Sequence, residues 1–135
     1  MKKTFSQRGR ASRLKGQRGE REFFKILSEL LGYDIKRNLS QTRDGGADSL
    51  CVDGWMIEVK YREQSQLGKW WRKIYFDATN SDRKPLLAYR ANHKEWVCAI
   101  SAQDIFDLDD DIKYCFEYVL LSPLLAAEVI RKTKK

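Results

Sequence analysis

Residues 54–62 of this 135-residue chain read GWMIEVKYR. The run of large apolar side chains predicts a buried β-strand over residues 55–61. Side chains alternate across a strand, so Glu58 and Lys60 point to the same face, while their apolar neighbours point to the other. Charges on a buried strand are costly unless other groups compensate for them. The strand therefore predicts further charged or ligand-binding groups close to this face.

The Asp-Gly pair immediately before this strand indicates a β-hairpin with a preceding strand over residues 48–52. We expect residues 52–54 to form a three-residue loop, with Gly54 in the left-handed conformation of a bulged turn. In that register Asp48 lies directly opposite Glu58, with about 4.5–5.5 Å between their Cβ atoms. A two-residue turn would instead point Asp48 away from Glu58.

Two carboxylates at that separation repel each other unless a cation lies between them. Their hard oxygen atoms favour Mg²⁺, for which Mn²⁺ is expected to substitute, over zinc. A divalent ion held in this way polarises a phosphoryl oxygen and lowers the pKa of a bound water. Lys60, on the same face, is placed to orient or deprotonate an attacking water. The alternative is an edge strand with a solvated ion pair, because a Glu-x-Lys triplet also arises by chance.

The first 21 residues carry the whole net charge of the chain. They contain eight basic residues and one acid, a surplus equal to the formal net charge of +7. A polycation of this kind is typical of a segment that binds a phosphate backbone. We expect residues 1–15 to form a flexible basic arm; a merely solvated tail is the alternative. The DNA-binding residues expected in this region are Arg8, Arg10, Arg13, Lys15 and Arg18.

The remaining segments predict helices around a mixed sheet. Apolar spacing and end signals predict helices over residues 16–31 (ended by Gly32), 64–80, 101–108 (capped by Ser101) and 122–131. Strand patterns fall over residues 33–39, 86–91, 95–100 and 113–121, with a turn at residues 92–94. The fold class is therefore α/β, with a mixed central β-sheet flanked by α-helices. We expect a single domain over residues 16–131 and a frayed basic tail at 132–135.

Composition excludes several other classes. No apolar run approaches the roughly 18 residues of a membrane span, and the start of the chain lacks a signal-peptide core, so we expect a cytoplasmic protein with no membrane partner. We also expect no organic cofactor. The three cysteines, Cys51, Cys98 and Cys115, lack CxxC spacing and are expected to be buried thiols. His93 is expected in a turn, and Ile112 at the required glycine position excludes a calcium loop over residues 107–118.

The helix expected over residues 64–80 combines aromatic and basic side chains. Trp70 and Trp71 are adjacent and diverge, so we expect at least one of them in the core, while the other is available to stack on bases. The same helix carries a basic cluster that either lines a DNA channel or forms its solvated side: Lys69, Arg72 and Lys73.

Three segments together resemble a known family. The residues GADSL (46–50), the spacing from Asp48 to Glu58 and the triplet EVK resemble the catalytic core of the PD-(D/E)xK nuclease superfamily, with Ala47 where many members have proline. The segment RGEREFFKIL (18–27) is similar to the opening helix of the Holliday-junction resolvases of archaea and their phage-encoded relatives. The resemblance covers roughly residues 15–100 and implies a restriction-endonuclease-like core.

This resemblance also implies roles for individual residues. Glu20 would supply a further acid, so that Glu20, Asp48 and Glu58 hold Mg²⁺ together with the carbonyl oxygen of Val59. The loop KRNLSQTRDGG (36–46) would place a basic residue and a hydroxyl near the scissile phosphate. Arg37 and Ser40 match these two roles and Arg43 adds a further DNA contact, although Ser40 could equally serve only to turn the chain.

The function that the resemblance implies is a Mg²⁺-dependent, structure-selective DNA endonuclease that resolves four-way (Holliday) junctions during recombination and repair. A junction is two-fold symmetric, so paired cuts require a symmetric homodimer. The apolar run 118–130 and the tryptophan helix are candidates for its interface. Two alternatives remain open: another PD-(D/E)xK nuclease, restriction-like or a repair nicking enzyme, and a non-catalytic DNA-binding module.

Overall fold

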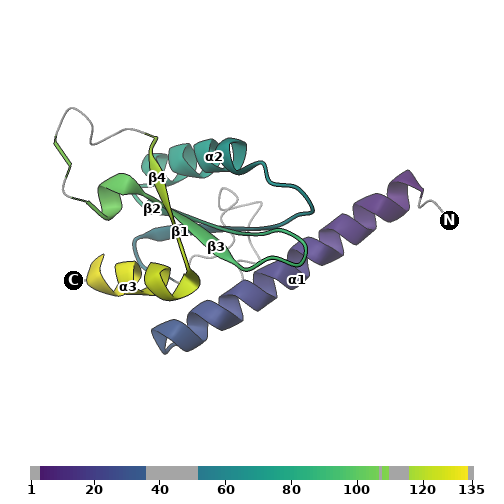
Figure 1. Ribbon diagram of the computed structural model, residues 1–135, viewed down its shortest axis with the longest axis horizontal. Helices are drawn as coiled ribbons and strands as arrows, with labels where there is room; N and C mark the ends of the chain where they lie inside the picture. Colours follow the sequence, from purple (N-terminus) through teal and green to yellow (C-terminus); the bar gives the residue numbers. More distant parts are fainter. Residues whose placement is uncertain (1–3, 36–51, 107, 110–115, 134–135) are drawn as a thin grey trace.

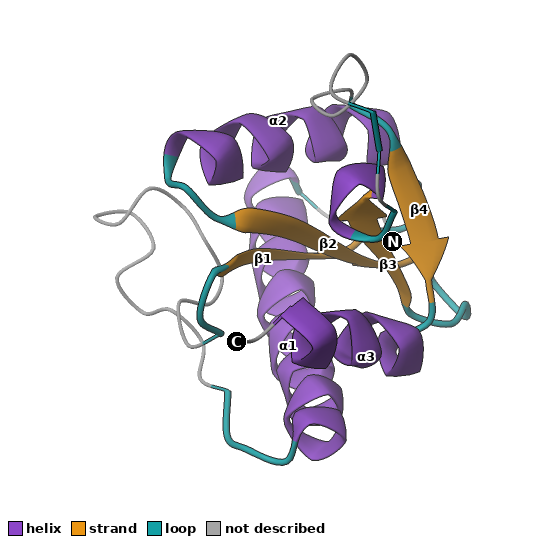
Figure 2. Ribbon diagram, turned by 90° about the vertical axis from the view of Figure 1, so that its left-hand side faces the viewer, coloured by secondary structure: helices purple, strands orange, loops and turns teal. Residues whose placement is uncertain are grey.

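The computed structural model describes residues 4–35, 52–106, 108–109 and 116–133. In chain order its elements are α1 (Phe5–Leu31), β1 (Trp55–Tyr61), α2 (Leu67–Asn80), β2 (Lys84–Arg90), β3 (Val97–Ser101), the 3₁₀ helix η1 (Ala102–Asp104), β4 (Tyr118–Leu121) and α3 (Pro123–Thr133). Helix α2 covers one face of the sheet, and α1 and α3 cover the other (Figures 1 and 2). The expected α/β class with a helix-flanked mixed sheet is confirmed, and the architecture is consistent with a restriction-endonuclease-like core.

The four described strands form one sheet in the order β1-β2-β3-β4. β1 runs parallel to β2, whereas β2, β3 and β4 are antiparallel neighbours. The sheet is therefore mixed, as expected. The strand predicted over residues 55–61 has those bounds, and the second hairpin is also confirmed, with His93 in its turn at φ 60°.

The two faces of the sheet bury separate apolar clusters because side chains alternate along each strand. Ile57 and Val59 of β1 pack toward α1 and α3, where Phe23 and Leu27 are fully buried. Met56 packs on the opposite face against α2. β1 is thus covered on both sides, and Glu58 shares the α2 side with Met56.

Helix α1 is longer than expected. It begins at Phe5 instead of residue 16, so residues 5–15, which we expected to form an arm, continue the same helix. Thr4 caps it: the Thr4 hydroxyl accepts from the Gln7 N–H (3.2 Å), and the Thr4 N–H donates to Oε1 of Gln7 (2.9 Å). Gly32, at φ 82°, ends the helix as predicted.

Several other expected bounds are wrong. Residues 33–35 do not form a strand, and residues 36–39 lie outside the described ranges. Ser101 belongs to β3, where it pairs with Tyr118, and makes no side-chain cap; the helix expected after it is only the three-residue η1. Of the strand expected over residues 113–121, the described residues 116 and 117 are not strand, and β4 begins at Tyr118. Helix α3 continues to Thr133, so the expected tail begins as helix.

Other expectations from composition can be checked in part. Cys98 is a buried free thiol whose pKa burial raises to about 12, while Cys51 and Cys115 are outside the described residues. Across the described ranges, no helix combines the length and the apolar character that crossing a membrane requires. Trp71 is buried and donates its Nε1–H to the Phe116 carbonyl at 2.9 Å, which confirms that one tryptophan of α2 belongs to the core.

Candidate active site

Glu58 and Lys60 lie on the same face of β1, as their spacing predicts. Lys60 Nζ is 3.5 Å from Glu58 Oε1, and the two side chains are only 16% (Glu58) and 21% (Lys60) exposed. Both charges are therefore held mostly out of water. Burying an ion pair costs solvation energy, and this cost is offset when further groups interact with the two charges.

Those groups come from α2. A cavity of about 120 Å³ lies between β1 and α2, and its polar lining consists of Glu58, Lys60, Lys69, Lys73 and Asp77. Lys69 and Lys73, two of the three residues expected either to line a DNA channel or to form the solvated side of this helix, thus lie in the same cavity as Glu58, and their role in DNA binding stays a prediction. Asp77 was not anticipated: it lies one helical turn after Lys73, and this spacing was the signal that could have placed it on the same side of the helix.

The electrostatics of Glu58 show which groups lie near it. Burial raises the pKa of its carboxyl, and the negative charge of Glu20 raises it further. Lys60, through its charge and a hydrogen bond, and Lys73, through its charge, lower the same pKa. Glu20 of α1 and Glu58 of β1 therefore interact although 38 positions separate them in the sequence.

Gly19 explains how α1 approaches β1 so closely. A Cβ atom added at Gly19 would lie 2.7 Å from Cβ of Tyr61, a distance at which one element must move. Only a residue without a side chain allows this approach. Because Glu20 follows Gly19 directly, the close contact holds the backbone of Glu20 at a fixed distance from β1.

The other acid of this helix segment has a different role. Oε1 of Glu22 accepts hydrogen bonds from Nη1 of Arg90 (2.8 Å) and from Nε1 of Trp96 (3.0 Å). These contacts tie α1 to the hairpin β2–β3. Glu22 is thus engaged in packing, and the role expected for Glu20 stays a prediction.

The turn before β1 is closed differently from the expected loop. The Trp55 N–H donates to the Val52 carbonyl at 3.1 Å, so Asp53 and Gly54 are the central residues of a tight turn. Gly54 has a φ of 79°, the left-handed conformation that was expected. Glycine adopts this φ without strain at the third position of a four-residue turn. Residues 52–55 therefore turn the chain without the three-residue loop that we expected. Asp48, and with it the expected pairing to Glu58, lies outside the described residues.

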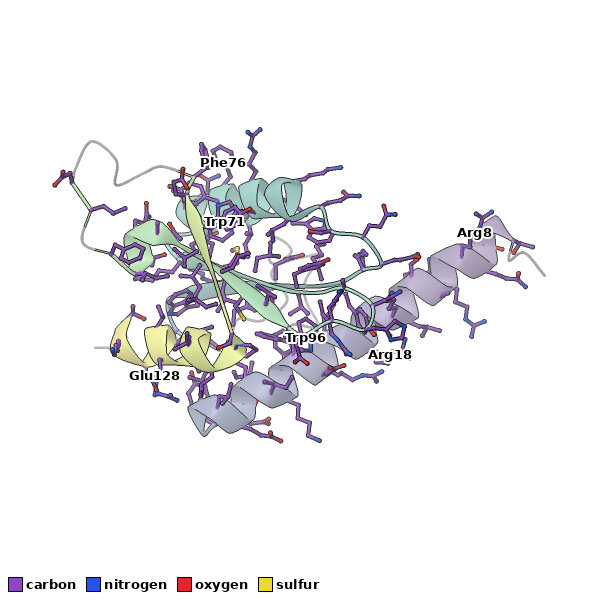
Figure 3. All side chains as sticks on the ribbon, in the orientation of Figure 1. Arg8, Arg18, Trp71, Phe76, Trp96 and Glu128 are labelled. Atoms are coloured by element: carbon purple, nitrogen blue, oxygen red, sulfur yellow. The ribbon has the colours of Figure 1, made fainter. Side chains whose placement is uncertain are left out.

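The basic residues expected to bind DNA occupy two elements. Figure 3 shows Arg8 near the free end of α1 and Arg18 where α1 passes the sheet. Lys15 Nζ lies over the ring of Tyr61, 4.8 Å from its centroid, and donates a hydrogen bond to Oδ1 of Asn92. Arg72 is exposed on α2. The remaining residues of this set, Arg37, Ser40 and Arg43, lie in the part of the chain that the structure does not describe.

The donor chemistry of the site fits a hard divalent cation. Glu20 and Glu58 bring two carboxylates together, and carboxylate oxygens are the ligands that Mg²⁺ prefers. Within the described ranges no three metal-ligating side chains cluster. The third expected ligand, Asp48, is outside those ranges, so the metal set stays a prediction.

One comparison with known proteins is informative. The sequence model of the family described as "Phage putative PDDEXK endonuclease" matches residues 11–123, most of the chain. No curated protein and no solved structure matches. The matched range includes Glu20, Glu58 and Lys60 together with all four described strands.

Proposed function

The chain belongs to the family of phage PD-(D/E)xK endonucleases, and from this premise we propose that it is a Mg²⁺-dependent, structure-selective enzyme that resolves four-way DNA junctions. Endonucleases of this superfamily act on DNA and generally use divalent metal ions. The observation that carries the proposal is the Glu58–Lys60 pair on one face of β1, with the charge of Glu20 from α1 acting on the Glu58 carboxyl. The enzyme would act in the cytoplasm of the host cell.

Glu20, Asp48, Glu58 and the carbonyl oxygen of Val59 are the proposed metal ligands. When bound, the ion polarises the phosphodiester and lowers the pKa of a nearby water. The electrostatics of Glu58 support this assignment, because the negative charge of Glu20 raises the pKa of the Glu58 carboxyl, and a cation bound between two carboxylates relieves such repulsion.

Lys60 is the proposed catalytic lysine. Its ammonium is already paired with Glu58 at 3.5 Å, so its position does not depend on bound substrate. As the ammonium, Lys60 orients the attacking water by donating a hydrogen bond to it; only as the neutral amine can Lys60 take the proton of that water. Lys69 and Lys73 line the same cavity and supply positive charge for the phosphate that is cut.

The first test replaces the Glu58 carboxylate by an amide of nearly the same size. Glu58→Gln should lower Mg²⁺-dependent cleavage by about 10³-fold or more, because a single catalytic group contributes about 10²–10⁴-fold and this one also binds the ion. DNA binding measured without metal should stay close to that of the original protein. The control is Glu29→Gln, which changes an exposed acid of α1 and should leave both quantities unchanged.

Two outcomes would contradict a catalytic role for Glu58. Full cleavage by Glu58→Gln would show that the carboxylate is not required. Loss of folding, seen as a lost cooperative thermal transition, would assign Glu58 to stability instead.

A separate experiment tests which kind of DNA the enzyme cuts. A resolvase should cut a synthetic four-way junction much faster than a plain duplex of the same sequence. Equal or faster cutting of the duplex would favour a restriction-like or repair nicking enzyme on the same core. Mg²⁺-independent binding without any cutting would favour the DNA-binding module.

Paired cutting also requires two copies of the chain, and we assign their contact to β4 and α3. Leu120, Leu124 and Leu125 are 49%, 57% and 52% exposed, an unusual concentration of large apolar side chains on adjacent elements. β4 has only β3 as a neighbour among the described strands, so its other edge can pair with a second strand. Leu120 pairs with Ala99 and so lies on the α2 side of the sheet, whereas α3 lies on the other side; a two-fold axis at this edge would bring Leu124 and Leu125 of the two copies together.

A further inference from the structure

A second hollow opens at the C-terminal end of β1. Its volume is about 370 Å³, within the range of sites that bind small molecules. Helix α1 contributes Ser12 and Lys15, the end of β1 and the following segment contribute Tyr61, Arg62 and Gln66, and α2 contributes one tryptophan. No role has been assigned above to this space.

The hollow adjoins the candidate active site. Tyr61 and Arg62 directly follow Lys60 along the chain. Trp70 lines both this hollow and the cavity that holds Glu58 and Lys60. Only the side chain of Trp70 would therefore separate a ligand in this hollow from the phosphate that the enzyme is proposed to cut.

Its lining combines three kinds of chemistry that match a nucleotide. Lys15 and Arg62 supply positive charge for a phosphate, and this charge exceeds the single negative charge of Glu63 in the same lining. Trp70 presents an aromatic ring, and every base can stack on such a ring. The side-chain amides of Gln64 and Gln66 supply donors and acceptors of the kind that bind base edges.

The aromatic groups are held in place without a ligand. Cations lie on the ring of Tyr61, with Lys15 Nζ 4.8 Å and Arg90 Cζ 5.1 Å from its centroid. Trp70 packs on Tyr89 with 5.5 Å between ring centroids. Arg62 donates from Nη1 to the Tyr61 carbonyl at 3.2 Å. Because these side chains are already ordered, little conformational entropy would be lost when a base binds.

We propose that this hollow binds one unpaired nucleotide of the DNA strand next to the cut, with its base on Trp70 and its phosphate on Lys15 and Arg62. The inference rests on the proposed nuclease function and specifies its substrate class: in a four-way junction, whose bases are paired, the nucleotide that enters the hollow is one whose base pair opens at the branch point. A paired base is stacked between its neighbours in the duplex, so only an unpaired or extruded base can reach Trp70. The hollow thus selects DNA with an unpaired nucleotide at a branch or a strand end.

The test measures binding without metal, so that it does not depend on cleavage. Fluorescence anisotropy in EDTA compares a duplex carrying a short single-stranded branch with a blunt duplex of the same sequence. The original protein should bind the branched DNA more tightly. Trp70→Ala should weaken binding of branched DNA by about 5- to 100-fold, the range for loss of one base–aromatic stack, and change binding of the blunt duplex little.

Two further variants separate stacking from folding. Trp70→Phe keeps a ring and should restore most of the preference for branched DNA. Phe76→Ala removes a 51% exposed ring from the same helix, outside the hollow, and should leave both affinities unchanged (Figure 3). Thermal unfolding of each variant reports whether the fold is intact.

Three results would overturn the inference: equal affinity of the original protein for the two DNAs, no effect of Trp70→Ala, or an equal loss for both DNAs. Failure of the nuclease proposal has a different signature. In that case the protein would cut nothing in Mg²⁺, whatever its affinity for the branched DNA in EDTA.

Discussion

Gly19 is the residue on which the geometry of the site depends most directly. Gly19→Ala places a methyl group 2.7 Å from Cβ of Tyr61, so α1 must move away from β1. We expect a loss of about 1–3 kcal/mol in the free energy of unfolding, as for other overpacked interiors. Cleavage should also fall, because Glu20 moves with the helix. Chemical denaturation and a cleavage assay measure the two effects.

The matched control is a second glycine of the same helix. An added Cβ at Gly9 would meet only the end of the flexible Arg13 side chain, at 3.7 Å. Gly9→Ala should therefore stabilise the protein by about 0.5–1 kcal/mol, since alanine favours the helix more than glycine does. Similar effects of the two substitutions would contradict the close-contact argument for Gly19.

Asp104 provides a prediction about pH. Burial raises the pKa of its carboxyl although Lys84 lowers it, and Oδ2 is buried without a hydrogen bond from the described residues. A carboxyl whose pKa is higher in the folded protein opposes folding when ionised. That cost is absent below the unfolded pKa of about 3.9 and grows as pH rises through the folded pKa.

Asp104→Asn should therefore raise the unfolding free energy at pH 7 and leave it nearly unchanged at pH 3. Urea denaturation at the two pH values measures the difference. The comparison is Asp82→Asn, which changes an exposed aspartate and should show no such pH-dependent gain. A stabilisation by Asp104→Asn that is equal at both pH values would point to a cause other than ionisation.

Helix α1 carries both the arginines proposed to bind DNA and the proposed metal ligand Glu20. Arg8, Arg10 and Arg13 lie on the same helix as Glu20, and Figure 1 shows that the N-terminal part of this helix extends beyond the sheet. Arg8 precedes Glu20 by 12 positions, or about 18 Å along the helix axis at 1.5 Å per residue. A duplex bound by this extension would therefore lie at a fixed distance from the site.

Replacing Arg8, Arg10 and Arg13 together by glutamine should lower the salt dependence of duplex binding. Each lost phosphate contact reduces the slope of log affinity against log salt by about 0.9, so the triple variant should lose up to about 2.7. Equilibrium titrations at several salt concentrations measure the slope. Replacing Arg21 and Lys25, exposed at the opposite half of α1, should change it much less. If the slope changes by the same amount per removed charge in both variants, the N-terminal extension of α1 contributes no more to duplex binding than the rest of the helix.

The elements also show what the sequence could and could not predict. The strand over residues 55–61 and the shared face of Glu58 and Lys60 follow from local alternation, and both are confirmed. The early start of α1 was missed because its basic residues suggested an arm, although Thr4 and Gln7 have capping-box spacing. The start of α1 is therefore visible in the local sequence, and only the interpretation of residues 5–15 as an arm was wrong.

Other features depend on contacts between distant segments. The parallel pairing of β1 with β2 joins strands separated by α2, and no local pattern specifies it. Asp77 and Trp70 line the site only because of the way α2 packs on the sheet. The resemblance to resolvases, not the periodicity, suggested Glu20, and its electrostatic coupling to Glu58 supports that suggestion.

At the scale of the whole molecule, basic and apolar surfaces lie at different ends. The basic extension of α1 projects from one end of the molecule, and α3 lies toward the other (Figure 1). A homodimer joined through β4 and α3 would bury Leu124 and Leu125 and leave both α1 extensions free to hold DNA. The symmetry of such a dimer matches the two-fold symmetry of a four-way junction.

Replacing both Leu124 and Leu125 by glutamate should therefore yield a monomer, because four charges would be buried at the two-fold contact. Light scattering coupled to size-exclusion chromatography measures the mass. Since each monomer carries one site, the variant should still nick junctions, but singly nicked intermediates should accumulate where the dimer gives paired cuts. Phe106→Glu, which changes another exposed apolar residue outside β4 and α3, should leave the dimer intact. If the original protein is monomeric at every concentration and on junction DNA, paired cutting by a preformed dimer is ruled out, and the nicking alternative becomes the better account of the same catalytic residues.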